Sequence, residues 1–174
     1  MRKGLVLLAV MAWACTNVQT STSSVTSTSS VTSTSSVTSA SPRPTEIFVY
    51  LTDIEATGGS IVLEVDVAQF LTGQEAAAAA SEDGAESPPP NDYYIRNPDP
   101  TTTSHPVAPD AEVTLTGEAS GGITDFTVSL AEWVEWTAGR GSPQGWNWYG
   151  QGHLPYWLTL QGDTVVAVRE QYLP

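Results

Sequence analysis

Glu132 and Glu135 are the acidic residues whose spacing could support catalysis. Glycoside hydrolysis uses two carboxylates that flank a cleft, and these two lie beside Trp133 and Trp136. The same pattern fits a solvated helix face on which Glu132 forms a capping box with Ser129. We take this second interpretation, which places Trp133 in the core and predicts no catalytic pair here.

Histidine, cysteine and serine give no pattern typical of nucleophilic catalysis or zinc binding. His105 and His153 are the only histidines, and Cys15 is the only cysteine. Neither Ser104 nor Ser142 lies in a nucleophile-elbow sequence, and a zinc site needs more His or Cys ligands than these. We expect no metal and no cofactor. The sequence favours a non-catalytic protein, with an extracytoplasmic hydrolase that uses acidic residues as the alternative.

Trp146, Trp148 and Tyr149 form the first candidate binding site. They lie in a glycine-rich loop at residues 140–152. Exposed aromatic side chains could stack on a sugar or insert into a partner protein. Alternatively, the loop folds over the core with its own indoles, and the sequence leaves both interpretations open.

Arg96 is the centre of the second candidate site. It shares one face of a short expected strand with Tyr94, and Asn97 follows. Glu170 belongs to an apolar row of the last expected strand, where a lone acid would be costly. We predict a structural ion pair between Arg96 and Glu170. The alternative is that Tyr94, Arg96 and Asn97 line a pocket for an anionic ligand.

A hairpin at residues 47–67 is the element on which the domain is organised. Residues 47–51 are apolar on both faces, as in a central strand. Gly58 and Gly59 supply the positive φ of a tight turn, and apolar residues then alternate with polar ones over 61–67. This alternation predicts a strand with one face toward solvent.

Two short helices and further strands complete the expected fold. Five consecutive alanines favour a helix over residues 74–80, and a second helix runs from Ser129 to Gly139. Strands are expected within 91–98, where a proline ends the strand, at 101–107 and 111–116 on either side of a Pro-Asp pair, and in a closing hairpin over 156–172. The fold class is α+β, a small antiparallel sheet that could close into a barrel.

The charge of the chain excludes some partners. Residues 46–174 contain all 19 acidic residues, three arginines and no lysine. Nucleic acids and anionic membrane surfaces attract proteins through basic residues. We therefore expect no nucleic-acid partner, and contact with a membrane only through an anchor.

The N-terminus resembles a bacterial export signal. Arg2 and Lys3 precede the apolar stretch 5–13, which is shorter than the ~20 residues of a membrane span. The residues that end at Cys15 resemble a lipobox, which implies a signal peptide at 1–14 and lipidation of Cys15. The alternative is an ordinary signal-peptidase site that leaves Cys15 unmodified.

Residues 15–45 are expected to form a disordered tether before a single globular domain at 46–174. Most of this tract is Ser and Thr with valines repeating every six residues, and isolated valines cannot bury enough surface to order a chain. Such a spacer would hold the domain away from an extracytoplasmic membrane surface.

Several segments resemble a group of small exported bacterial proteins of uncharacterised function. They are residues 91–98 (NDYYIRNP) and the closing stretch 155–174, with shorter likenesses at 49–51 and 70–76. The resemblance implies one intact domain and no particular reaction. Because the sequence has a long spacer and no convincing catalytic set, we predict a surface-tethered, non-catalytic domain that binds an envelope protein, a glycan or a small ligand, with a purely structural envelope lipoprotein as a further alternative.

Overall fold

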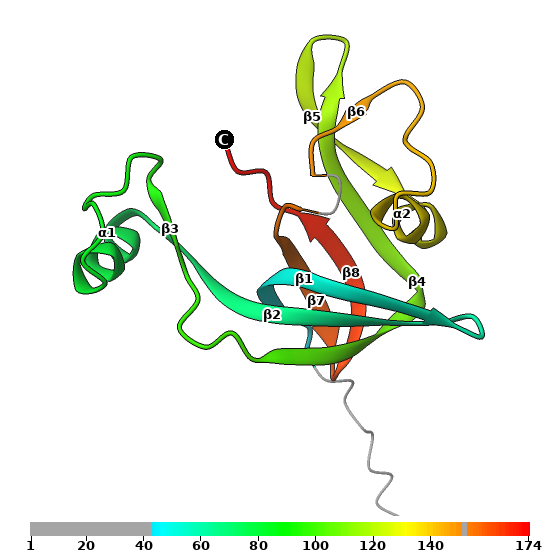
Figure 1. Cartoon of the computed structure of the whole chain (residues 1–174), viewed down its shortest axis with the longest axis horizontal. Helices are drawn as coiled ribbons and strands as arrows, with labels where there is room; N and C mark the ends of the chain where they lie inside the picture. Colours follow the sequence, from blue (N-terminus) through cyan, green and yellow to red (C-terminus); the bar gives the residue numbers. More distant parts are fainter. Residues whose placement is uncertain (1–42, 151–152) are drawn as a thin grey trace, which may run out of the picture. The chain divides into compact units, whose positions relative to one another are not determined.

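The computed structural model describes residues 43–150 and 153–174, which all belong to one compact unit (Figure 1). The predicted signal peptide, the lipidation of Cys15 and the tether up to residue 42 lie outside these residues. No helix within the described ranges is long and apolar enough to cross a membrane.

Five strands close into a barrel. In order around the barrel they are β1 (Thr45–Thr57), β2 (Ser60–Thr72), β4 (Thr102–Ala119), β8 (Thr164–Glu170) and β7 (Tyr156–Gln161), which pairs again with β1. All neighbours are antiparallel except β4 and β8, which run parallel. The described chain is therefore mostly β, with a closed five-stranded barrel. The sequence predicted an α+β fold whose sheet could close into a barrel, but an entirely antiparallel one, and the β4–β8 pair is parallel.

The remaining elements extend or cover the barrel. Three short strands pair with its members: β3 (Tyr93–Arg96) with β2, and both β5 (Gly122–Val128) and β6 (Asn147–Trp148) with β4. The two short helices are α1 (Gly73–Glu82) and α2 (Leu130–Thr137). Figure 1 shows the loop after α2 running back to β6 beside β5.

The two strands expected on either side of the Pro-Asp pair are one continuous strand, β4. The chain accommodates Pro109 through an irregular register against β8, which lies between Val107 and Glu112. A bulge of this kind removes the need for a backbone donor at the proline, so the strand continues.

The apolar residues of β1 face two different clusters. Val49 is fully buried in the barrel with Leu63 and Leu115. Phe48 points to the outside and is also buried, with its ring centroid 5.1 Å from that of Phe70 and 5.2 Å from that of Trp157. A strand apolar on both faces, as predicted, therefore reflects one core inside the barrel and a second aromatic cluster outside it.

α2 closes the barrel core. The predicted capping box is present, because Glu132 N–H donates to Ser129 Oγ (3.2 Å) and Ser129 N–H donates to Glu132 Oε2 (3.0 Å). Capping of this kind contributes about 1 kcal/mol to a helix. Trp133 is completely buried and packs edge-to-face on Tyr156, with 5.7 Å between ring centroids. The core role predicted for Trp133 is confirmed.

Candidate functional site

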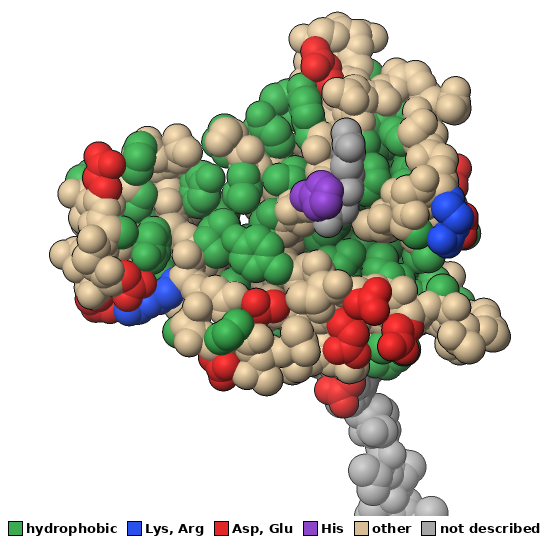
Figure 2. Space-filling view, viewed as in Figure 1, with side chains coloured by type: hydrophobic (Ala, Val, Ile, Leu, Met, Phe, Trp, Pro, Cys, Tyr) green, Lys and Arg blue, Asp and Glu red, His purple; other side chains and the backbone are tan. Residues whose placement is uncertain are grey.

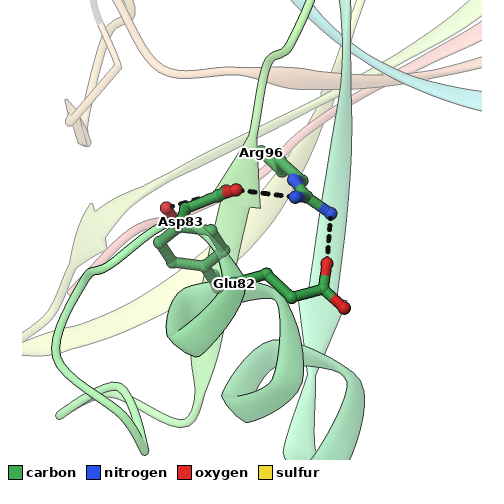
Figure 3. A network of polar contacts seen from close by, with 4 residues as sticks. Glu82, Asp83 and Arg96 are labelled. Atoms are coloured by element: carbon green, nitrogen blue, oxygen red, sulfur yellow. Dashed lines mark hydrogen bonds and ion pairs between the residues drawn. The ribbon is translucent and has the colours of Figure 1, made fainter.

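Arg96 pairs with the end of α1 and not with Glu170, so the predicted ion pair is wrong. Its Nη1 donates to Glu82 Oε2 (3.1 Å) and its Nη2 to Asp83 Oδ1 (2.6 Å), as Figure 3 shows. β3 pairs with the far end of β2, directly before α1. Two carboxylates from the end of α1 therefore reach the guanidinium, while Glu170 lies in the barrel.

Tyr94, Arg96 and Asn97 do line one pocket, together with Asp83. Tyr94 O–H donates to Asp83 Oδ2 (3.2 Å), and Asn97 Nδ2 donates to Asp66 Oδ2 (2.7 Å). The hydrogen bond with Asp83 is the main cause that raises the pKa of Arg96. Because acidic side chains already neutralise this cation, the pocket offers little attraction for an anionic ligand.

Arg96→Gln is expected to loosen α1 with little change in the global unfolding temperature. The ion pairs lie at the surface, where such pairs contribute little to overall stability, but they join α1 to β3. Amide hydrogen exchange should accelerate within α1 and remain unchanged in the barrel strands. Arg140→Gln is the control, because Arg140 pairs with Glu135 beside α2; equal loosening of α1 in both variants would contradict the prediction.

Glu170 is a buried carboxylate held by donors from three other elements. Its side chain accepts hydrogen bonds from Thr116 N–H of β4 (2.9 Å), Trp148 Nε1–H (2.9 Å) and Tyr156 O–H of β7 (3.5 Å). Burial raises the pKa of Glu170, although these hydrogen bonds act in the opposite direction. These three hydrogen-bond donors satisfy the buried carboxylate, so Glu170 does not need the guanidinium partner that we predicted.

Two glycines let the loop after α2 lie directly on the barrel. A Cβ atom on Gly150 would lie 1.6 Å from Glu170 Oε1. A Cβ atom on Gly117 of β4 would lie 2.4 Å from the carbonyl oxygen of Asn147. Both positions have backbone too close to a neighbour for any side chain, so the site depends on their being glycine.

Trp148 and Trp146 take different positions in this loop. Trp148 is buried, with its indole N–H on Glu170. Trp146 is half-buried and stacks on Phe126 of β5, with 4.0 Å between centroids and 11° between planes. Tyr149 is also half-buried and donates its hydroxyl to Glu118 (2.8 Å). The loop therefore does fold over the core with its own indoles, but Trp146 stays partly exposed.

A groove of about 510 Å³ lies between this loop and the last turn of α2. The aromatic side chains on its wall are Trp136, Trp146 and Trp148. The indole of Trp136 is 6.1 Å from that of Trp146, at 71° between planes, and 6.4 Å from that of Trp148. Because the first two rings are nearly perpendicular, they form a corner in the wall.

The polar side chains on the groove wall include Ser142, Asn147 and His153. Both Asn147 and His153 are exposed. Sequence reasoning singled out Trp146 and Trp148 but missed Trp136 as a wall residue. The sequence signal for Trp136 was its position three residues after the buried Trp133, because residues i and i+3 are neighbours on a helix surface.

Acidic residues do not converge on this groove. Glu132 is used in the helix cap, and Glu135 accepts two hydrogen bonds from Arg140 (2.6 and 2.9 Å). In Figure 2 the basic side chains on the drawn face lie beside acidic ones. Within the described ranges, no group of three or more His, Cys, Asp and Glu residues could hold a metal ion.

No family model, no curated protein and no solved structure matches this chain.

Proposed function

We propose that the protein is a surface-tethered, non-catalytic binding domain of the cell envelope, and that the groove beside α2 is its binding site. The observation that carries the proposal is the groove itself: three indoles on its wall, with Trp136 and Trp146 only half-buried. Ligand pockets are typically lined by aromatic side chains with a few polar groups that set orientation. The groove has this composition.

Side-chain and backbone contacts hold the loop that forms the groove in place. Glu170 holds the indole N–H of Trp148, and Phe126 supports the ring of Trp146. Backbone pairing of β6 with β4 fixes the segment between them. A wall prepared in this way loses little conformational entropy on binding, which favours affinity.

A hydrolase that uses acidic residues would need two carboxylates facing one cleft, and this groove does not provide them. Glu170 has the raised pKa expected of a general acid, but its side chain is only 3% exposed and engages three donors. It is not on the groove wall, and no other acidic residue is there. Binding without catalysis is therefore the better-supported function.

We also propose that the barrel belongs to the OB class, the five-stranded Greek-key barrels. The order β1-β2-β4-β8-β7 with one parallel pair, and α2 before β7 in the chain, supports this assignment.

Such barrels commonly bind ligands on the face of their second and third strands, which are β2 and β4 in this protein. Here that face carries Glu64 and Asp66 on β2, which disfavours nucleic acid there. Fold analogy gives no ligand.

Removal of either half-buried indole is expected to reduce binding of the protein to its envelope. We expect Trp136→Ala and Trp146→Ala each to weaken co-sedimentation of the full chain with isolated cell envelopes by about tenfold or more, as is usual for aromatic anchors. Ile123→Ala is the matched control, because Ile123 is an exposed apolar residue of β5 that does not line the groove.

The proposal fails if both tryptophan variants sediment as the unchanged protein does while retaining its circular dichroism spectrum. Lipid anchoring would also retain the protein on membranes, so Cys15→Ser is introduced into every variant.

Mass spectrometry of the mature N-terminus tests the anchor separately: a diacylglycerol-sized mass on Cys15 is expected, and an unmodified Cys15 would contradict it.

A further inference from the structure

We infer that the ligand of the groove is an uncharged carbohydrate, bound through a sugar ring against Trp146 and Trp136. This inference rests on the proposed function and names the chemistry of its ligand.

The charge of the groove wall is the first argument. Residues 46–174 carry 19 acidic residues, yet no Asp, Glu, Lys or Arg lines this groove. A cationic ligand would find no carboxylate for an ion pair, and an anionic ligand would find no Lys or Arg while entering the field of an acidic domain. The wall therefore fits a neutral ligand better than a charged one.

The arrangement of the indoles is the second argument. Phe126 covers one face of Trp146, so a sugar ring could stack only on the opposite face. The face of an aromatic ring is electron-rich, and it attracts the weakly positive C–H bonds that line one face of a sugar ring. Trp136 stands at 71° to Trp146, so the two indoles offer a sugar two aromatic surfaces at an angle to each other.

The polar side chains of the wall are the third argument. Neither the Ser142 hydroxyl nor the Asn147 amide has a hydrogen-bond partner among the described residues. A hydroxyl both donates and accepts, and an amide offers two donors and one acceptor oxygen. Sugar hydroxyls also donate and accept, so a neutral sugar can pair with both side chains. A proline-rich peptide also favours aromatic grooves, but it offers mainly carbonyl acceptors.

The test is a titration of the full chain with soluble hexasaccharides, followed by tryptophan fluorescence and calorimetry. The neutral probes are the hexamers of cellulose, xylan, mannan, amylose and chitin. The charged probes are hexagalacturonate and hexaglucosamine, and a deca-proline peptide represents the peptide class. We expect at least one neutral probe to bind, with both charged probes and the peptide about tenfold weaker or more, which is 1.4 kcal/mol.

Variants show whether this binding occurs in the groove. Trp146→Ala is expected to weaken the neutral probe about tenfold or more, and Trp146→Phe to retain most of the affinity, because stacking on an aromatic ring persists. Since Trp146→Ala also removes the contact with Phe126, Asn147→Ala provides a second variant whose exposed side chain supports no described contact. It should weaken binding several-fold and leave the unfolding temperature unchanged.

The outcomes distinguish a failure of the carbohydrate inference from a failure of the proposed function. Groove-dependent envelope binding with no response to any neutral probe would overturn the carbohydrate inference and preserve the proposed function. Tighter groove-dependent binding of a charged probe or of the peptide would do the same. Envelope binding that ignores the groove variants would overturn both. A neutral probe that binds equally well to the protein and to the Trp146→Ala and Asn147→Ala variants would place the sugar elsewhere and overturn the inference.

Discussion

Replacement of Gly150 by alanine is expected to lower the free energy of unfolding by about 3 kcal/mol or more. The added Cβ atom would lie 1.6 Å from Oε1 and 2.5 Å from Cδ of Glu170. Overpacking of a core position costs about 1–3 kcal/mol. The carboxylate can withdraw only by leaving Trp148 N–H and Thr116 N–H, and a buried donor without an acceptor costs about 1–3 kcal/mol more.

Gly122→Ala is the matched control for this effect. A Cβ atom at Gly122 meets nothing within 4 Å, and its backbone is outside the left-handed region, as at Gly150. Its effect should stay within about 0.5 kcal/mol. Urea denaturation followed by tryptophan fluorescence measures both variants.

The steric cause can be isolated by combining two substitutions. In a Glu170→Ala background the carboxylate is absent, so Gly150→Ala should then have a much smaller effect than in the unchanged protein. Strictly additive free energies for the two substitutions would show that Gly150 and Glu170 do not interact, and would contradict the described contact.

Substitution of Glu170 is expected to give the second large effect, and its size should depend on the replacement. Glu170→Ala leaves the indole N–H of Trp148 and the backbone N–H of Thr116 without their acceptor in a buried site. The expected loss is about 2–5 kcal/mol. Glu170→Gln keeps the shape and one acceptor oxygen for these donors, so it should retain most of the stability.

The pH dependence of stability provides a direct test of the buried carboxyl. Burial raises the pKa of Glu170 above its ordinary value of 4.5, so the folded protein binds this proton more strongly than the unfolded chain does. The contribution of Glu170 to the free energy of unfolding is therefore fully present below about pH 4.5 and is lost as the pH rises through the folded-state pKa.

Glu170→Gln removes this titration. The difference in unfolding free energy between the unchanged protein and the Gln variant should therefore shift in favour of the variant as the pH increases from 4 to 8. Taking the difference cancels the opposite contribution of Glu132 and Glu135, whose pKa values are lowered by hydrogen bonds with Ser129 and Arg140. A difference that does not change with pH would mean that the pKa of Glu170 is not raised in the folded protein.

Features of this fold that depend on neighbouring residues could be predicted from the sequence. The capping box of α2 needs only Ser129 and Glu132, three residues apart. The β1–β2 hairpin needs only two glycines between apolar runs, and its observed register places Thr57 opposite Ser60. Burial of Trp133 also followed from the spacing of apolar residues on one helix. Local geometry determines such features, and it is encoded in a few consecutive residues.

The partners of the charged residues depended on the tertiary structure. Both Arg96 and Glu170 have polar partners, as expected, but neither partner is the one that we predicted. Glu82 lies 14 residues before Arg96, and Thr116 lies 54 residues before Glu170. Sequence periodicity indicates which face of a strand a residue occupies. It does not indicate which distant element covers that face.

The groove was decided by the same kind of long-range packing. Its loop lies on the barrel because Gly117 and Gly150 permit close approach at two separate places, and because Glu170 accepts the indole proton of Trp148. Trp136 joins the wall only because α2 ends beside that loop. The amino-acid sequence by itself determined the hairpin, the helix cap and the acidic, lysine-free character of residues 46–174. Barrel closure then brought distant side chains together, since burial and hydrogen bonding are satisfied by contacts in space.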